Sequence, residues 1–135
     1  MRFVVELPEQ KTKQTSHGMF IAYYNLKMPV KLRRITTSAV PGKKYTAEFD
    51  IDGRKTKMVH FGAAGMDDYT ITHDKAQRAR YRSRHAKDLE TFDPLSPGYL
   101  SYYILWGNSI NLQKNARAYN RFFLSRRPRW PRWAR

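Results

Sequence analysis

The chain has 135 residues, of which 41% are hydrophobic and 14% aromatic, and it carries a formal net charge of +15. This apolar content argues against wholesale disorder, and the length suits about one domain. The absence of cysteine excludes disulfides, thiolate zinc sites and a cysteine nucleophile.

The positive charge is concentrated in two segments that contain no acid. Residues 10–47 hold eight Lys or Arg and no Asp or Glu, and residues 94–135 hold another eight and none. Residues 48–93 hold nine charges of each sign. This partition predicts a charge-balanced folded centre and two basic arms that contact a polyanion or an acidic protein surface.

The amino-terminal segment, residues 1–42, is predicted to be a basic strand-forming arm or an extension of a sheet. Arg2–Leu7, Met19–Asn25 and Val30–Thr37 are rich in β-branched and aromatic residues. The third of these runs carries three cations, Lys31, Arg33 and Arg34. A strand in the chain's own sheet and a strand donated to a partner have the same pattern, so both alternatives stay open.

No run of residues approaches the roughly 20 consecutive apolar residues that a membrane span needs. The amino terminus offers only Phe3-Val4-Val5 before Glu6, which is not the apolar core of a signal peptide. The sequence therefore predicts no membrane span and a protein that stays inside a cell or is assembled there.

Residues 43–124 are predicted to form a compact α+β module that begins with a β-hairpin over about residues 44–61. Asp52-Gly53 is a favoured pair for a two-residue type I′ turn. That turn pairs Asp50 with Lys55 and Glu48 with Lys57 on one face of the hairpin. The other face is then apolar and predicted to be buried: Tyr45, Ala47, Phe49, Ile51 and Met58.

Two or three helices are predicted after the hairpin, over about residues 74–90, 97–106 and 109–124. Asp74 with Gln77 resembles a capping box, and Ser96 before Pro97 is a favoured helix start. The helix over 97–106 is apolar nearly all round, which indicates burial. Gly107 is predicted to end it in the left-handed conformation, and Asn108 or Ser109 to cap the next helix.

The last segment, residues 125–135, is predicted to be an extended tail, because Pro128 and Pro131 are incompatible with a helix interior. Interleaved Arg and Trp suit stacking on bases with phosphate pairing, and equally suit a neighbouring protein with apolar pockets and carboxylates. Candidate residues for binding a polyanion or partner are therefore cations and tryptophans of both arms: Lys31, Arg33, Arg34, Lys114, Arg117, Arg121, Arg126, Arg127, Arg129, Trp130, Arg132, Trp133 and Arg135.

A metal-dependent nuclease that uses His60, Asp68 and His85 is the weakest hypothesis. Histidine and carboxylate ligands can hold a divalent ion that activates water. The spacing here matches no standard metal motif, and the chain has no Walker loop, nucleophile elbow or dinucleotide fingerprint. The sequence therefore predicts no catalytic residues, no metal and no cofactor.

A set of short motifs occurs between about residues 43 and 123: Val59-His-Phe-Gly62, Gly65-x-x-Asp68-Tyr-Thr70, His73-Asp74, Arg78-x-x-Tyr81-x-x-Arg84-His85 and Tyr103-x-Leu105-Trp106-Gly107. Their order resembles a family of small basic proteins of uncharacterised function that large double-stranded DNA viruses of algae and amoebae encode. Motif residues of unknown role are His60, Phe61, Gly62, Asp68, Tyr69, Thr70, Asp74, Tyr81, Arg84 and His85.

This resemblance implies a non-enzymatic structural component of a large DNA virus particle. Such a minor capsid or internal virion protein would link larger subunits through its basic, aromatic arms. Its expected partners are other virion proteins, among them the major capsid protein, and it would be made in the host cytoplasm or nucleus. The alternative is a nucleic-acid-binding protein that packages or condenses the viral genome, with DNA or RNA bound by the arms.

Overall fold

Three antiparallel strands open the part of the chain, residues 29–124, that the computed structural model describes. The strands β1 (Val30–Thr37), β2 (Lys43–Ile51) and β3 (Lys55–Ala63) form a sheet in the order β1-β2-β3. The helical segments follow: α2 (Tyr69–Thr72), α3 (Lys75–His85), the 3-10 segment η1 (Ala86–Thr91), α4 (Pro97–Leu100) with its π-helical continuation η2 (Ser101–Leu105), and α5 (Leu112–Tyr119) with its π-helical continuation η3 (Asn120–Leu124). The fold is therefore α+β, as predicted.

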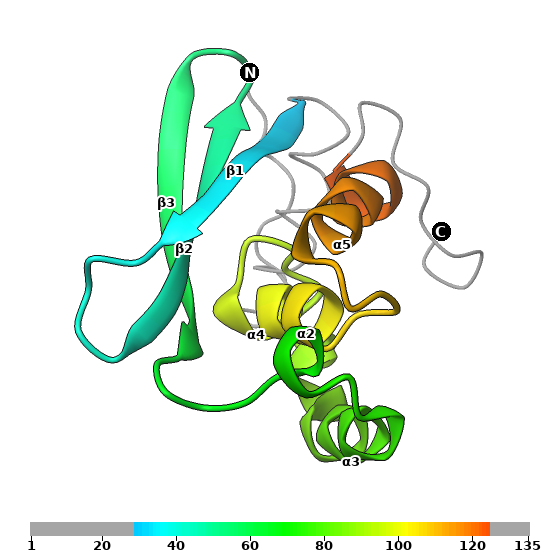
Figure 1. The fold of residues 1–135 in the computed structure, drawn as a ribbon. Coiled ribbons are helices and arrows are strands. Elements are labelled where there is room, and N and C mark those ends of the chain that lie inside the picture. Colours follow the sequence, from blue (N-terminus) through cyan, green and yellow to red (C-terminus); the bar gives the residue numbers. More distant parts are fainter. Residues whose placement is uncertain (1–28, 125–135) are drawn as a thin grey trace.

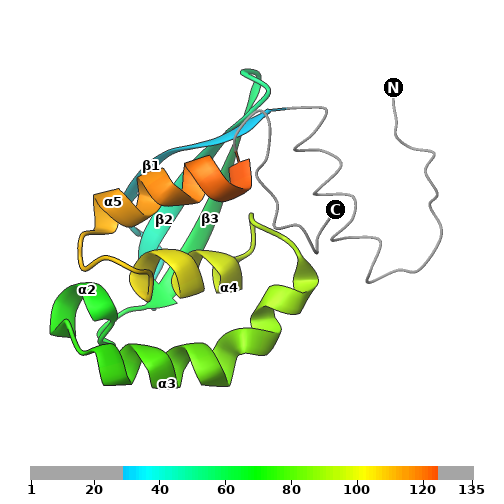
Figure 2. The same cartoon turned by 90° about the vertical axis from the view of Figure 1, so that its right-hand side faces the viewer.

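The helices gather on one side of the sheet (Figures 1 and 2). α4 and η2 contact β3, and η3 contacts β1. α3 lies on the far side of α4 from the sheet in both views. None of its residues is fully buried, which agrees with its thin apolar content. No helix within residues 29–124 is long and apolar enough to cross a membrane.

The hairpin turn lies where the sequence places it, but the strand register differs by one residue. Asp52 and Gly53 have φ of 56° and 69°, and the Arg54 amide donates to the Ile51 carbonyl at 3.0 Å. Ile51 pairs with Lys55, so Arg54 is an additional loop residue. The predicted pairs Asp50–Lys55 and Glu48–Lys57 are therefore wrong, because Asp50 lies opposite Thr56 and Glu48 opposite Met58.

The register shift decides which side chains of β3 are buried. A shift of one residue moves every side chain of a strand to the other face of the sheet. Val59 and Phe61 are buried opposite Ala47 and Tyr45, whereas Met58, predicted to be buried, is 53% exposed. Of the predicted core positions of β2, Ala47, Phe49 and Ile51 are buried, and Tyr45 is partly buried against the core.

β1 belongs to the chain's own sheet, which answers one question that the sequence left open. It pairs with β2, and the register slips between Leu32 and Arg34, which places a bulge at Arg33. The predicted strands Arg2–Leu7 and Met19–Asn25 and the tail 125–135 lie outside the described residues.

The free edge of β1 is covered by a side chain of η3. The Leu32 amide donates to Oδ1 of Asn120 at 2.9 Å, and Nδ2 of Asn120 donates to the Leu32 carbonyl at 2.9 Å. The carboxamide thus supplies the donor and the acceptor that a neighbouring strand would supply. This pair of bonds fixes the carboxy-terminal helix against β1.

The predicted helix starts at Asp74 and Ser96 are confirmed. The Asp74 carboxylate accepts from the amides of Ala76 and Gln77, and the Ser96 hydroxyl accepts from the Tyr99 amide. The predicted capping box is only half formed, because the Gln77 side chain accepts from the Thr72 hydroxyl. The third helix is capped by Asn111, whose side chain accepts from the Lys114 amide, and not by Asn108 or Ser109.

Gly107 is required for close packing and not for a left-handed conformation, so the prediction for this residue was wrong. Its φ is not positive. A Cβ at this position would clash with the Tyr103 carbonyl oxygen and would lie 2.9 Å from Cγ of Asn115. Asn115 is buried and donates to the carbonyls of Ile104 and Ser109, so it cannot move aside without losing these bonds.

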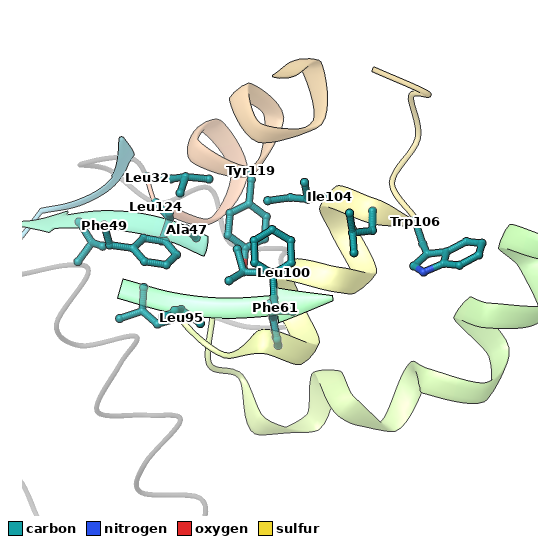
Figure 3. Packing of buried hydrophobic residues seen from close by; sticks show 14 of the residues in the cluster. Leu32, Ala47, Phe49, Phe61, Leu95, Leu100, Ile104, Trp106, Tyr119 and Leu124 are labelled. Carbon is teal, nitrogen blue, oxygen red and sulfur yellow. The ribbon is translucent and has the colours of Figure 1, made fainter. Parts of the chain in front are cut away.

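The core lies between the sheet and the α4–η2 and α5–η3 helices (Figure 3). Phe49 and Phe61 from the sheet and Leu100, Ile104 and Tyr119 from the helices are almost completely buried. Tyr119 satisfies its hydroxyl by donating to the Pro94 carbonyl at 2.6 Å. The apolar segment predicted over 97–106 is confirmed as a core element.

Replacing Asn120 should loosen the carboxy-terminal helix from the sheet. Asn120→Ala removes both bonds to Leu32 and should lower the free energy of unfolding by about 1–3 kcal/mol, measured by urea denaturation. Gln113→Ala, at an exposed site of α5, is the matched control and should change stability by less than about 0.5 kcal/mol. Equal effects of the two substitutions would contradict the role given to Asn120.

Alkaline pH should unfold the protein through its buried tyrosines. Burial raises the pKa of Tyr81, Tyr99, Tyr103 and Tyr119 above the ordinary phenol value. Above about pH 10 the unfolded chain releases protons that the folded chain keeps, so the free energy of unfolding should fall as pH rises. Urea denaturation at a series of alkaline pH values measures this decline. Tyr119→Phe should make the decline shallower, and a decline unchanged by that substitution would contradict the assignment.

Candidate polyanion-binding groove

An open groove of about 540 Å³ lies between the start of β1 and the α5–η3 helix. The residues that line it come from the two ends of the described segment: Pro29, Val30, Lys31, Arg117, Asn120, Arg121 and Leu124. The Asn120–Leu32 bonds described above bring these two ends together. The groove is therefore a product of tertiary contact between the two ends of residues 29–124, which together form the folded module.

All charged side chains that line the groove are cations. Lys31 lies on the β1 side, and Arg117 and Arg121 lie about one helical turn apart on the other side. All three are exposed, and within residues 29–124 none forms an ion pair with a carboxylate. The Arg121 guanidinium lies 5.1 Å from the centre of the Phe122 ring. The groove can thus offer at least three cationic hydrogen-bond donors to an anionic ligand.

The other predicted cations have different environments. Arg33 forms an ion pair with Asp50, and Arg34 with Glu48, each at 3.4 Å across the sheet. Lys114 is exposed on α5 but does not line the groove. The tail residues lie outside the described part of the chain: Arg126, Arg127, Arg129, Trp130, Arg132, Trp133 and Arg135. Of the predicted cations, the structure brings together Lys31, Arg117 and Arg121.

Asp68, the acidic residue of the Asp-Tyr-Thr motif, forms a buried ion pair with Lys44 of β2. Its carboxylate is 1% exposed and lies 2.6 Å from the Lys44 ammonium. The same carboxylate caps α2 by accepting from the amide and hydroxyl of Thr70, and Lys44 also donates to the Met66 carbonyl. This arrangement connects the sheet to the first helix.

Aromatic and arginine residues of the motifs, together with the neighbouring Arg82, connect α3 to the end of η2. Tyr81 stacks between Trp106 and His85, with ring centres 4.5 and 4.1 Å away. Arg82 donates to the Trp106 carbonyl, and Arg78 donates to the Gly107 carbonyl while its guanidinium lies over the Tyr69 ring. Cations at the carbonyl end of a helix are favoured by its dipole. These side chains therefore have structural contacts.

The remaining motif residues are distributed over separate parts of the fold. Phe61 is in the core, and Gly62 has a φ of 83° with little room for a Cβ beside Leu105. His60 shares a hydrogen bond with Thr46, His85 shares one with Asp88, and Asp74 caps α3. Arg84 is exposed.

The three residues of the nuclease hypothesis do not form a common site. His60 contacts Thr46, Asp68 contacts Lys44, and His85 contacts Asp88. Among residues 29–124, no group of three or more His, Asp or Glu is arranged to hold a metal ion. The described part of the chain therefore offers no support for this weakest hypothesis.

Sequence reasoning missed Asn120 as part of the site and Lys44 as the partner of Asp68. Asn120 follows Tyr119, which lies at helical spacing from Leu112 and Ala116. Only this place beside an apolar position could have indicated a role for Asn120. Lys44 is the second residue of β2, and nothing in the local sequence distinguishes it from an exposed cation. Both assignments depend on contacts between distant segments.

Comparison with known proteins matches residues 33–85 to a family of unknown function, DUF5754. The matched segment runs from within β1 to the end of α3 and includes the Lys44–Asp68 pair. No curated protein and no solved structure matches the chain. The groove cations Lys31, Arg117 and Arg121 lie outside the matched segment.

Removing the carboxylate of Asp68 should destabilise the module strongly. Asp68→Ala leaves the Lys44 ammonium, whose side chain is 12% exposed, without its counter-charge, and should cost about 3–5 kcal/mol. Asp50→Ala breaks the more exposed pair with Arg33 and should cost less than about 1 kcal/mol. Urea denaturation of both variants compares them. Similar small losses would show that Asp68 is not a structural anchor.

Proposed function

We propose that the protein is a non-enzymatic structural component of a large DNA virus particle, a minor capsid or internal virion protein that links larger subunits. The observation that carries this proposal is the position of the module's two ends. Pro29 and Leu124, the first and last described residues, both line the same groove. The two basic segments that continue beyond them therefore begin at one place on a packed module. Such an arrangement suits a linker that anchors on one subunit surface and contacts others.

The fold supports a binding role more than a catalytic one. Asp68 and Tyr81 are the motif residues whose side chains are most suited to acid–base chemistry. Asp68 instead forms a buried ion pair and caps a helix, and Tyr81 stacks on Trp106. The exposed cations of the groove have no carboxylate partner in the described residues. The viral assignment and the major capsid protein as partner rest on the sequence motifs that resemble proteins of large DNA viruses.

A second candidate function is the binding of nucleic acid during packaging of the viral genome. The observation that favours it is the convergence of Lys31, Arg117 and Arg121 on one groove. Cations gathered on one surface release counterions when they contact phosphates, which supplies affinity. The two functions differ in where the protein is expected within a particle.

The protein should be present in purified particles at a fixed copy number relative to the major capsid protein. Quantitative mass spectrometry of intact particles measures that ratio. A linker of capsid subunits should stay with shells from which the genome has been released. Absence from particles would contradict the proposal, and departure together with the released DNA would favour the second candidate function instead.

A further inference from the structure

The three cations that line the groove are suited to binding several phosphate groups along one ligand. We propose that Lys31, Arg117 and Arg121 bind the phosphodiester backbone of a nucleic-acid strand. This inference rests on the second candidate function and gives it a specific site, on the module itself and separate from the Arg/Trp tail.

The spacing of the cations supports an extended ligand. Arg117 and Arg121 are separated by about one turn of helix, which is about 6 Å along the axis for four residues. Lys31 lies on the opposite side of the groove. A backbone that lies along the open groove can therefore meet a cation from both sides.

The charged side chains of the groove suit a phosphodiester backbone better than a peptide main chain as the ligand. The charged side chains of the groove can only donate, and the Asn120 carboxamide is engaged with Leu32. A phosphodiester backbone presents acceptors and needs no acceptor in return. A peptide main chain presents a donor at nearly every residue, and the groove side chains offer these amides no free charged acceptor.

The groove offers little apolar surface beside its cations. Pro29, Val30 and Leu124 also line it, but Val30 and Leu124 are each only 2% exposed, so a ligand there meets mainly the charged side chains. A positively charged groove that follows the backbone is a common feature of proteins that bind single strands. A single strand, whose flexible backbone can bring its phosphates to these cations, is therefore the assigned ligand.

The contacts within the module explain why these cations and not others are assigned. Arg33 and Arg34 meet Asp50 and Glu48, and Arg78 and Arg82 donate to main-chain carbonyls. A ligand that bound those four would have to displace an existing partner. Lys31, Arg117 and Arg121 need lose no carboxylate or carbonyl bond of the module to bind phosphate.

The test measures binding of the full-length chain to a labelled oligothymidylate of about 20 nucleotides over a series of salt concentrations. The triple variant Lys31→Gln, Arg117→Gln, Arg121→Gln should lower the slope of log affinity against log salt by about 2, from about 0.7 for each lost contact. The control triple variant Lys75→Gln, Arg80→Gln, Lys87→Gln removes the same charge from exposed positions of α3 and η1. Its slope should remain close to that of the parent.

Arg117→Lys with Arg121→Lys should keep the parent slope, because the charge is retained. Thermal unfolding of each variant verifies the fold, which these substitutions of exposed side chains should leave intact. Equal loss of slope in the two triple variants would overturn the groove assignment while leaving nucleic-acid binding standing. A parent chain that does not bind the oligonucleotide would overturn both. A groove variant that binds the oligonucleotide normally but loses polyglutamate would assign the groove to an acidic protein surface.

Discussion

The two hydrogen bonds between Asn120 and the main chain of Leu32 join segments 88 residues apart. An edge strand exposes amides and carbonyls that invite unwanted pairing, and a carboxamide can satisfy both kinds of group at once. The contact fixes η3 against β1 and places Leu124 in the core. It also sets the distance between the β1 cation and the helical arginines. Within residues 29–124 this edge is closed by a side chain and not by another strand, which leaves room for the groove.

A second constraint joins the sheet to the remaining helices. The Lys44–Asp68 pair costs desolvation that only good geometry repays, and here the carboxylate also accepts from Thr70. Arg78 and Arg82 then attach α3 to the end of η2. Most of the segment that matches the family of unknown function, residues 33–85, is thus concerned with building the fold. The proposed ligand contacts, Lys31, Arg117 and Arg121, lie outside the matched segment. The family match therefore covers the contacts that build the fold and does not cover the groove.

Local signals in the sequence were enough to predict the fold class, the turn at Asp52-Gly53 and two of the three helix starts. The strand register was not predictable from the turn alone, because Arg54 becomes an extra loop residue that no local preference marks. Packing of the core determines the register, because the observed register buries Val59 and Phe61 whereas the predicted register would bury Met58. The prediction for Gly107 was wrong for a related reason: its need for glycine comes from close contacts with the Tyr103 carbonyl and with Asn115 of another helix, which no local preference marks.

The sequence predicted which types of residue form the candidate site but not which of them lie together. It identified the cations, but whether each cation is free to bind a ligand depends on its neighbours in the fold. Asp50 and Glu48 offset the charge of Arg33 and Arg34, while helix carbonyls engage Arg78 and Arg82. The formal charge of +15 therefore overstates the charge that a ligand meets at most points of the module. The groove is an exception, because no acid is among the residues that line it and its three cations are therefore not offset there.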